Sequence, residues 1–153
     1  MNENEKIVEI THLIASNYPT IRKYFRALVS LEGLPITTTQ LACLVSVKHN
    51  PQITMSALAK QMYMSNQQLT KVIDNLVHFG LIERIHDENN RRQIFVDVTA
   101  KGLKVLLDLK TEIQLKLNVA LKIHFSAQEI DKILESAIFL NQCIEKVNKA
   151  SKE

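Results

Sequence analysis

Apolar residues recur three or four positions apart over most of the chain, which is the spacing of one face of an α-helix. The first such stretch runs from about Glu5 to Leu31 and has Pro19 in its middle. Because proline lacks a backbone N–H donor, this position predicts a break or a kink in the helix. Only three glycines and three prolines occur in the whole chain, so the other apolar stretches are free to form long helices.

Two shorter stretches at the centre predict a helix-turn-helix. The segment "TMSALAKQM" offers Thr54 or Ser56 as an N-cap, and "YM" connects it to "SNQQLTKVIDNLVHFG". Ser65 with Gln68 three residues later forms a capping box, and Gly80 ends the second helix. The second helix has a narrow apolar stripe, made of Leu69, Val72, Ile73 and Leu76. A helix is also expected just before the pair, in "TTTQLACLVSVKHN", with an apolar face of Leu41, Leu44 and Val45.

A β-hairpin is predicted directly after the second helix. "LIERIH" and "RQIFVDVT" are rich in β-branched residues, and the alternation is clearest at Ile94, Val96 and Val98. The intervening "DENN" supplies turn-forming residues. A hairpin fused to a helix-turn-helix is a winged helix.

The rest of the chain predicts two long helices. One runs from Ala100 to His124, and a capping box from Ser126 to Glu129 opens the other. Both are too apolar for a solvated surface and need a partner. The fold class is therefore mostly α with a small β-hairpin: a winged helix-turn-helix flanked by N- and C-terminal dimerisation helices. We assign residues 36–99 to the winged helix-turn-helix lobe, and residues 1–35 together with 100–153 to a helical dimerisation region.

Composition and charge limit the class of protein and its expected compartment, but they do not identify a function. The 153 residues carry a net charge of only +3, so the placement of charge must decide whether nucleic acid is a partner. The polar, acidic amino terminus excludes a secretory signal, and no apolar run is long enough to cross a bilayer. Cys43 and Cys143 lie far apart without a CxxC spacing. We expect a soluble cytoplasmic protein with reduced thiols and no membrane partner.

The outward face of the second central helix is a candidate reader of DNA. In a helix-turn-helix this helix enters the major groove with its first turns against the base edges. The residues placed to make contact are Ser65, Asn66, Gln67, Gln68, Thr70 and Lys71. Amides pair bidentately with adenine, which favours an A/T-rich operator. A solvated helix face would suit the same residue types equally well.

Basic residues near the hairpin tip favour the DNA-binding interpretation. Arg91 and Arg92 are adjacent, repel each other and are not required by a turn, whereas a narrow A/T minor groove attracts arginine. Arg84 at the start of the hairpin and Lys60 at the end of the preceding helix are candidate phosphate contacts.

These residues together resemble the MarR family of transcriptional regulators. The matching pattern runs from "LPITTTQLACL" through "MSALAKQMYMSNQQLTKVIDNLVHFGLIERIHDENNRRQIFVDVTAKG", about half the chain. The resemblance implies a homodimer on a pseudo-palindromic double-stranded operator, usually a repressor released by a ligand or by oxidation. It places Gln67, Thr70 and Lys71 in the major groove and Arg92 in the minor groove. Two positions depart from the family: Asn90 stands where aspartate is usual, and Lys71 where many members have arginine.

Several residues could form the site at which such a regulator detects its signal, and each of them can also be explained as a structural residue. Cys43 is a possible redox switch, although a buried cysteine is commonly a packing residue. A small anionic or aromatic effector is the family default, and its candidate pocket residues, which packing explains as well, are His12, Tyr18, Arg22 and Tyr24. The five histidines show no close helical pairing and there is no HExxH, so no metal or other cofactor is expected.

Three classes of function fit a chain of this kind to different degrees. A dimeric DNA-binding regulator explains the arginines at the tip and the polar helix face. A winged-helix module that binds protein would not need those arginines. We set the enzyme class aside, because the sequence shows no phosphate-cradling glycine loop and no recognisable nucleophile elbow or metalloprotease motif.

Overall fold

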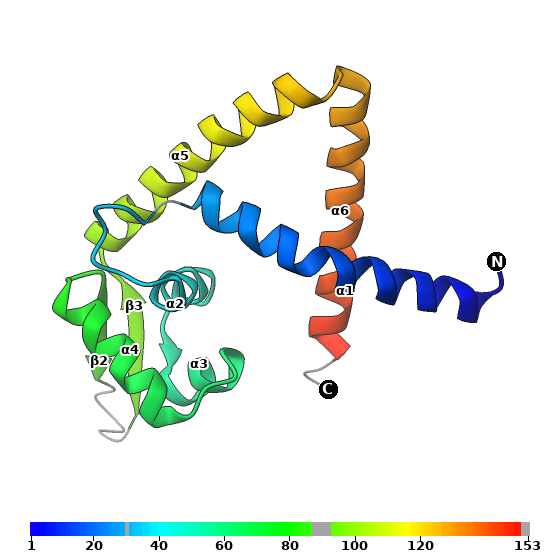
Figure 1. The fold of residues 1–153 in the computed structure, drawn as a ribbon. Coiled ribbons are helices and arrows are strands. Elements are labelled where there is room, and N and C mark those ends of the chain that lie inside the picture. Colours follow the sequence, from blue (N-terminus) through cyan, green and yellow to red (C-terminus); the bar gives the residue numbers. More distant parts are fainter. Residues whose placement is uncertain (30, 87–92, 151–153) are drawn as a thin grey trace. The chain divides into compact units, whose positions relative to one another are not determined.

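The structure is a computed structural model that describes residues 1–29, 31–86 and 93–150, with side chains as far as residue 147. These ranges contain six helices and three strands (Figure 1). In chain order they are α1 (Glu3–Leu28), α2 (Thr38–His49), β1 (Ile53–Thr54), α3 (Met55–Gln61), α4 (Asn66–His78), β2 (Ile82–His86), β3 (Ile94–Val98), α5 (Ala100–His124) and α6 (Ala127–Ala150). The predicted class, mostly α with a small β-hairpin in a winged helix-turn-helix, is confirmed, and a third short strand extends the hairpin to a sheet.

The chain divides into two compact units, Met1–Glu112 and Ile113–Glu153. The first contains α1 to α4, the sheet and the beginning of α5, and the second contains the rest of α5 and all of α6. The predicted limits of the DNA-binding lobe, residues 36 and 99, stay a prediction. In the described part of the chain, no helix combines the length and hydropathy that crossing a membrane requires.

The predicted helix starts are confirmed at the level of hydrogen bonds. Thr54 Oγ1 accepts the N–H of Ala57 at 3.2 Å, so Thr54 is the N-cap of α3. The capping box of α4 is complete, as is the reciprocal pairing of Ser126 with Glu129 ahead of α6. Hydrogen bonds from the backbone and hydroxyl of Ser126 lower the pKa of Glu129. Caps depend on residues three apart, which is why the sequence predicts them well.

The predicted break of the helix at Pro19 is wrong, because α1 continues through this residue from Glu3 to Leu28. Proline removes one N–H donor, whereas the turns on either side keep their own hydrogen bonds. Side chains before it also bond back to the helix: the Ser16 hydroxyl donates to the carbonyl of His12, and the Asn17 amide to that of Leu13. No residue of α1 is buried.

The hydrophobic core lies where α2, α3 and α4 meet the sheet. Its fully buried side chains are Cys43, Leu44, Val47, Leu58, Leu69, Ile73, Leu76, Ile82 and Val96. The predicted inward position of Val45 is wrong, because this side chain is 37% exposed. Cys43, Leu44 and Val47 share the buried face of α2, and Val45 projects from nearly the opposite side at 100° per residue.

The sheet has three antiparallel strands in the order β1-β3-β2. The predicted hairpin is confirmed, with Ile82 opposite Val98 and His86 opposite Ile94. Strand β1 was not predicted, because two residues are too few to show an alternating pattern. Its Ile53 pairs with Val96, which ties the connection before α3 to the central strand.

The first turn of α5 is held against the end of α4. The Thr99 hydroxyl donates to the carbonyl of Gly80 at 2.6 Å and accepts the N–H of Gly102 at 3.0 Å. Lys101 Nζ donates to the carbonyl of Phe79 at 2.7 Å, where α4 ends. A cation near the last carbonyls of a helix is favourable, because those carbonyls have no partner within the helix. These bonds join the end of α4 to the residue that follows β3 and to the first turn of α5.

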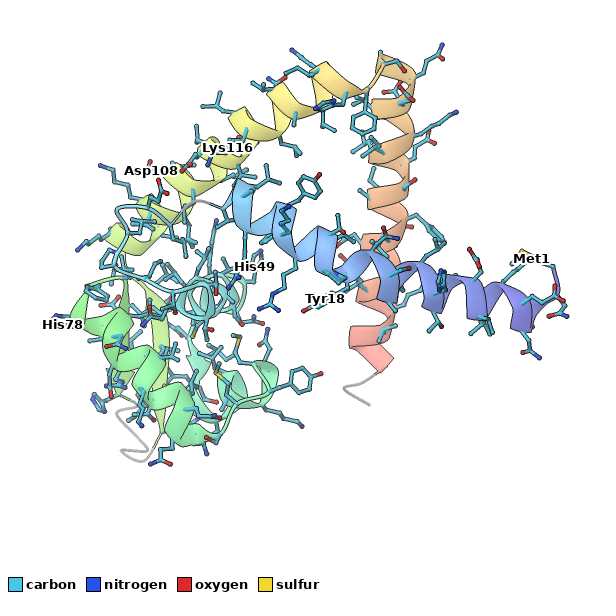
Figure 2. All side chains as sticks on the ribbon, viewed as in Figure 1. Met1, Tyr18, His49, His78, Asp108 and Lys116 are labelled. Atoms are coloured by element: carbon cyan, nitrogen blue, oxygen red, sulfur yellow. The ribbon has the colours of Figure 1, made fainter. Side chains whose placement is uncertain are left out.

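Large apolar side chains are exposed along α1, on the later turns of α5 and on α6. Figure 2 shows side chains standing out along α1, Tyr18 among them. Those at least half exposed on α1 are Ile7, Val8, Ile10, Leu13, Ile14, Tyr18, Ile21, Tyr24 and Phe25, and those on α6 are Leu134, Ile138, Phe139, Leu140, Ile144 and Val147. Exposed apolar side chains in this number along a helix are typical of a protein interface.

Candidate nucleic-acid interface

Helix α4 is fixed in rotation by its apolar face. Leu69, Ile73 and Leu76 are completely buried against the core. The side chains on the other face are all exposed: Asn66, Gln67, Thr70, Lys71, Asp74 and Asn75. Since α4 follows α3 after a short turn, this polar face belongs to the second helix of a helix-turn-helix (Figure 1). That is the surface through which such motifs approach the major groove.

The six side chains predicted on the recognition helix have different roles in the free protein. The Ser65 hydroxyl accepts the N–H of Gln68, and Gln68 Oε1 accepts the N–H and the hydroxyl of Ser65 at 3.0 and 3.1 Å. The Thr70 hydroxyl donates to the carbonyl of Asn66 at 2.8 Å. Three of the six are thus engaged in local bonds. Asn66, Gln67 and Lys71 present exposed side chains at the start of the helix.

Arg84 joins the wing to the recognition helix. Its Nη2 donates to Asp74 Oδ1 at 2.7 Å, which connects β2 to α4. The arginine side chain is 29% exposed and the aspartate side chain 54% exposed. The sequence suggested a phosphate contact for Arg84 and did not show this pairing, because the partner lies ten residues earlier on another element. Its guanidinium therefore has a protein partner in the absence of DNA.

We expect Arg84 to act mainly by holding the wing on α4. In a double-mutant cycle of Arg84→Ala and Asp74→Ala, measured by urea unfolding, the coupling should be about 0.5 kcal/mol, since the pair is partly exposed. One phosphate contact contributes about 0.9 to the slope of log affinity against log salt. Arg84→Ala should lower this slope by less than that amount, whereas Lys60→Ala should lower it by the full amount. This role would be contradicted if the two substitutions had additive effects on stability and Arg84→Ala lowered the salt slope by the amount of one whole phosphate contact.

The wing arginines Arg91 and Arg92, and Asn90 before them, lie outside the described residues. The strand ladder leads to this segment, with His86 paired to Ile94.

Lys60 is exposed in the last turn of α3, as a contact with the DNA backbone requires. One feature near it was missed from the sequence: Tyr63, between α3 and α4, is 98% exposed and has φ of +52°.

Cys43 is a core residue. Its side chain is fully buried on α2, and burial raises the pKa of the thiol to about 11. Thiolate is the reactive form, so a thiol with this pKa is unreactive at neutral pH. The packing interpretation agrees with this geometry, and the redox alternative lacks an accessible thiolate.

The four candidate effector residues are all exposed and all lie on α1. Tyr18 and Arg22 are one turn apart and share a face. Tyr24 projects from nearly the opposite side at about 100° per residue. The four side chains therefore do not converge on one site from α1 alone, and Tyr18 with Arg22 is the pair that this helix brings together.

Comparisons with known proteins agree with this geometry. Residues 36–94 match the model of the MarR family. The uncharacterised HTH-type transcriptional regulator YfiV of Bacillus subtilis is 26% identical over 116 residues, 76% of this chain and 72% of that protein. The multiple antibiotic resistance protein MarR of Salmonella typhimurium is 33% identical over 75 residues, 49% of this chain and 52% of that protein. The chain thus matches about half the length of the latter.

Solved structures share the fold over nearly the whole chain. A MarR family protein from Bacillus stearothermophilus superimposes with a TM-score of 0.71 at 22% identity, covering 100% of this chain and 99% of that one. FabT of Streptococcus pneumoniae, solved in complex with DNA, gives a TM-score of 0.58 at 22% identity, covering 95% and 99%. The helix-turn-helix with its wing, the matched family model and the related regulators together make this chain similar to the MarR family of winged-helix transcriptional regulators.

Proposed function

We propose that the protein is a homodimeric, sequence-specific regulator of transcription that binds double-stranded DNA, and that it represses until a small-molecule effector releases it. The observation that carries the proposal is the orientation of α4. Because Leu69, Ile73 and Leu76 are completely buried, the polar face of α4 points outward. The ion pair of Arg84 with Asp74 holds the wing beside the same helix. The structural neighbour FabT, which was solved in complex with DNA, supports the same function.

Sequence would be read by the exposed amides at the start of α4. Asn66 and Gln67 are suited to bidentate pairing with adenine, and Lys71 to an acceptor on guanine or to a phosphate. Arg91 and Arg92 would grip the flanking backbone and a narrow minor groove. This combination favours an A/T-rich operator with two half-sites. Lys60 would add a phosphate contact at the end of α3.

Homodimerisation would cover the exposed apolar surface of α1 and α6. Two recognition helices related by a two-fold axis would then meet a pseudo-palindromic operator, with half-sites about 34–36 Å apart. The limits proposed for the two regions are residues 36–99 for the DNA-binding lobe and residues 1–35 with 100–153 for the dimerisation region. Such a regulator would work in the cytoplasm, where its operator is.

Release by an effector requires only a change in the separation or angle of the two DNA-binding lobes, since both must fit one duplex. A small anionic or aromatic molecule is the chemistry that Tyr18 and Arg22 would recognise. His12 and Tyr24 would need side chains from other elements to complete the same site. Equal separation of the recognition helices in effector-bound and free dimers would exclude this mode of release.

The test is fluorescence anisotropy of the protein on duplex DNA from its own upstream region, titrated across salt. We expect binding whose log affinity falls with log salt by about 0.9 for each phosphate neutralised. Arg92→Ala should weaken binding to all duplexes. Gln67→Ala should chiefly reduce the preference over scrambled DNA, by about 1–3 kcal/mol for a lost bidentate pair.

The matched control is Gln128→Ala, which removes the same side-chain type from an exposed position in the first turn of α6. It should leave both affinity and preference unchanged. Binding that does not depend on salt, or no binding to any duplex, would contradict the proposal. A winged-helix module that binds protein would then be the better interpretation, to be tested by identification of its partner.

A further inference from the structure

Tyr63 is a large aromatic residue that the fold of the lobe does not use. It lies in the turn between α3 and α4, and it is 98% exposed. Its neighbours Met62 and Met64 are both partly buried and pack against the hydrophobic core. The chain therefore directs the residues on either side inward and leaves the ring of Tyr63 in solvent.

The backbone at Tyr63 is one that glycine adopts far more readily. Its φ is +52°, in the left-handed region. The N–H of Tyr63 donates to the carbonyl of Lys60 at 3.2 Å, and the N–H of Met64 to that of Ala59 at 2.9 Å. This pair of bonds is the Schellman arrangement that ends many helices, in which the left-handed position is usually glycine and sometimes asparagine. A side chain with a Cβ is disfavoured there, and a bulky one is uncommon.

The position of Tyr63 explains what the ring can contact. Ser65, the N-cap of α4, follows two residues later, so its Cα is within roughly 7 Å along the chain. The start of the recognition helix enters the major groove, so the turn before it faces the sugar-phosphate strand at the edge of that groove. Lys60, whose backbone carbonyl accepts the N–H of Tyr63, is an exposed cation three residues earlier in the chain.

We propose that Tyr63 is a DNA-backbone contact that fixes how far α4 enters the groove. The ring would lie against a deoxyribose and the hydroxyl would donate to a phosphate oxygen, which suits a side chain with an apolar body and a polar tip. The contact is independent of sequence and positions the amides of α4 for reading bases. It rests on the proposed DNA-binding function and adds to it a residue outside the recognition helix and the wing.

The test compares Tyr63→Asn and Tyr63→Phe with the wild-type protein, using operator affinity and Tm together. Asparagine tolerates the left-handed backbone, so Tyr63→Asn should keep or raise the Tm while affinity falls about tenfold, as expected for a lost hydrogen bond to a charged group. Tyr63→Phe should keep the Tm. Its affinity should fall nearly as much as that of Tyr63→Asn, because phenylalanine lacks the hydroxyl that makes the hydrogen bond. The salt slope should stay unchanged in both, since a neutral hydroxyl displaces no counterion, whereas Lys60→Ala should reduce it by about 0.9.

The outcomes separate this inference from the proposed function. If the wild type binds DNA and Tyr63→Asn binds equally well, the Tyr63 contact is wrong and the regulator stands. If the wild type binds no duplex, both are wrong. A large fall in Tm with Tyr63→Asn would mean that the ring stabilises the fold, and would overturn the proposal. A preference over scrambled DNA that changes with Tyr63→Phe would contradict a sequence-independent contact.

Discussion

Replacing Leu134 with glutamate should convert the proposed homodimer into monomers and abolish high-affinity operator binding. Leu134 is 58% exposed on α6, beside Ile138 one turn later, which is 50% exposed. In a dimer that covers this face, a carboxylate without a partner would be buried in apolar surroundings. That costs about 3 kcal/mol or more, a loss of at least about a hundredfold in the association constant.

Sedimentation equilibrium over a range of protein concentrations measures this directly. The matched control is Gln128→Glu, which adds the same charge to an exposed polar position of the same helix, about 120° around its axis from Leu134, and should leave the dimer intact. DNA affinity should fall with the dimer, because a monomer contacts only one half-site. A Leu134→Glu protein that stays dimeric at wild-type concentrations would show that the dimer uses another surface.

Gly102→Ala should destabilise the protein by about 1–3 kcal/mol, the usual cost of overpacking a tight contact. A Cβ added at Gly102 would lie 2.2 Å from the carbonyl oxygen of Leu81 and 2.7 Å from Val98 Cγ1. The carbonyl cannot move freely, because it accepts the N–H of Thr99 at 3.1 Å. Glycine to alanine within an exposed helix would instead stabilise by about 1 kcal/mol, so the sign of the effect is diagnostic.

Urea unfolding at one fixed protein concentration gives the measurement, because stability depends on concentration for a dimer. Gly80→Ala is the comparison. Gly80 has φ of +69° but its added Cβ would meet only the Lys101 side chain at 3.8 Å, so that variant should lose only the cost of a left-handed alanine, about 1–2 kcal/mol. A Gly102→Ala protein as stable as the wild type would mean that α5 does not approach Leu81 this closely.

The elements and their caps were predictable because their determinants are local. Ser65 and Gln68 are three residues apart, and so are Ser126 and Glu129, and each pair forms the bonds expected from spacing alone. The recognition face followed from the same periodicity, once Leu69 and Ile73 marked the buried side. Errors arose where local rules left a choice. Val45 and Val47 are equally apolar, and only packing decided that Val47 faces the core.

Other features of the site depend on residues that are distant in sequence. Arg84 meets Asp74 and Gly102 meets Leu81 because separate elements fold against each other. The strand at Ile53 exists only because β3 is there to pair with it. The exposure of Tyr63 likewise depends on how α3 ends.

The sequence by itself determined the helices, their caps, the hairpin and the polar face of α4, since these follow from hydrogen bonds and periodicity within about four residues. Only the tertiary structure decided that Arg84 is held by Asp74, that burial raises the pKa of the Cys43 thiol to about 11, and that a Cβ at Gly102 would meet the carbonyl oxygen of Leu81. Those properties are set by which surfaces meet, and contacts between separate elements are a matter of three-dimensional packing that neighbouring residues do not specify.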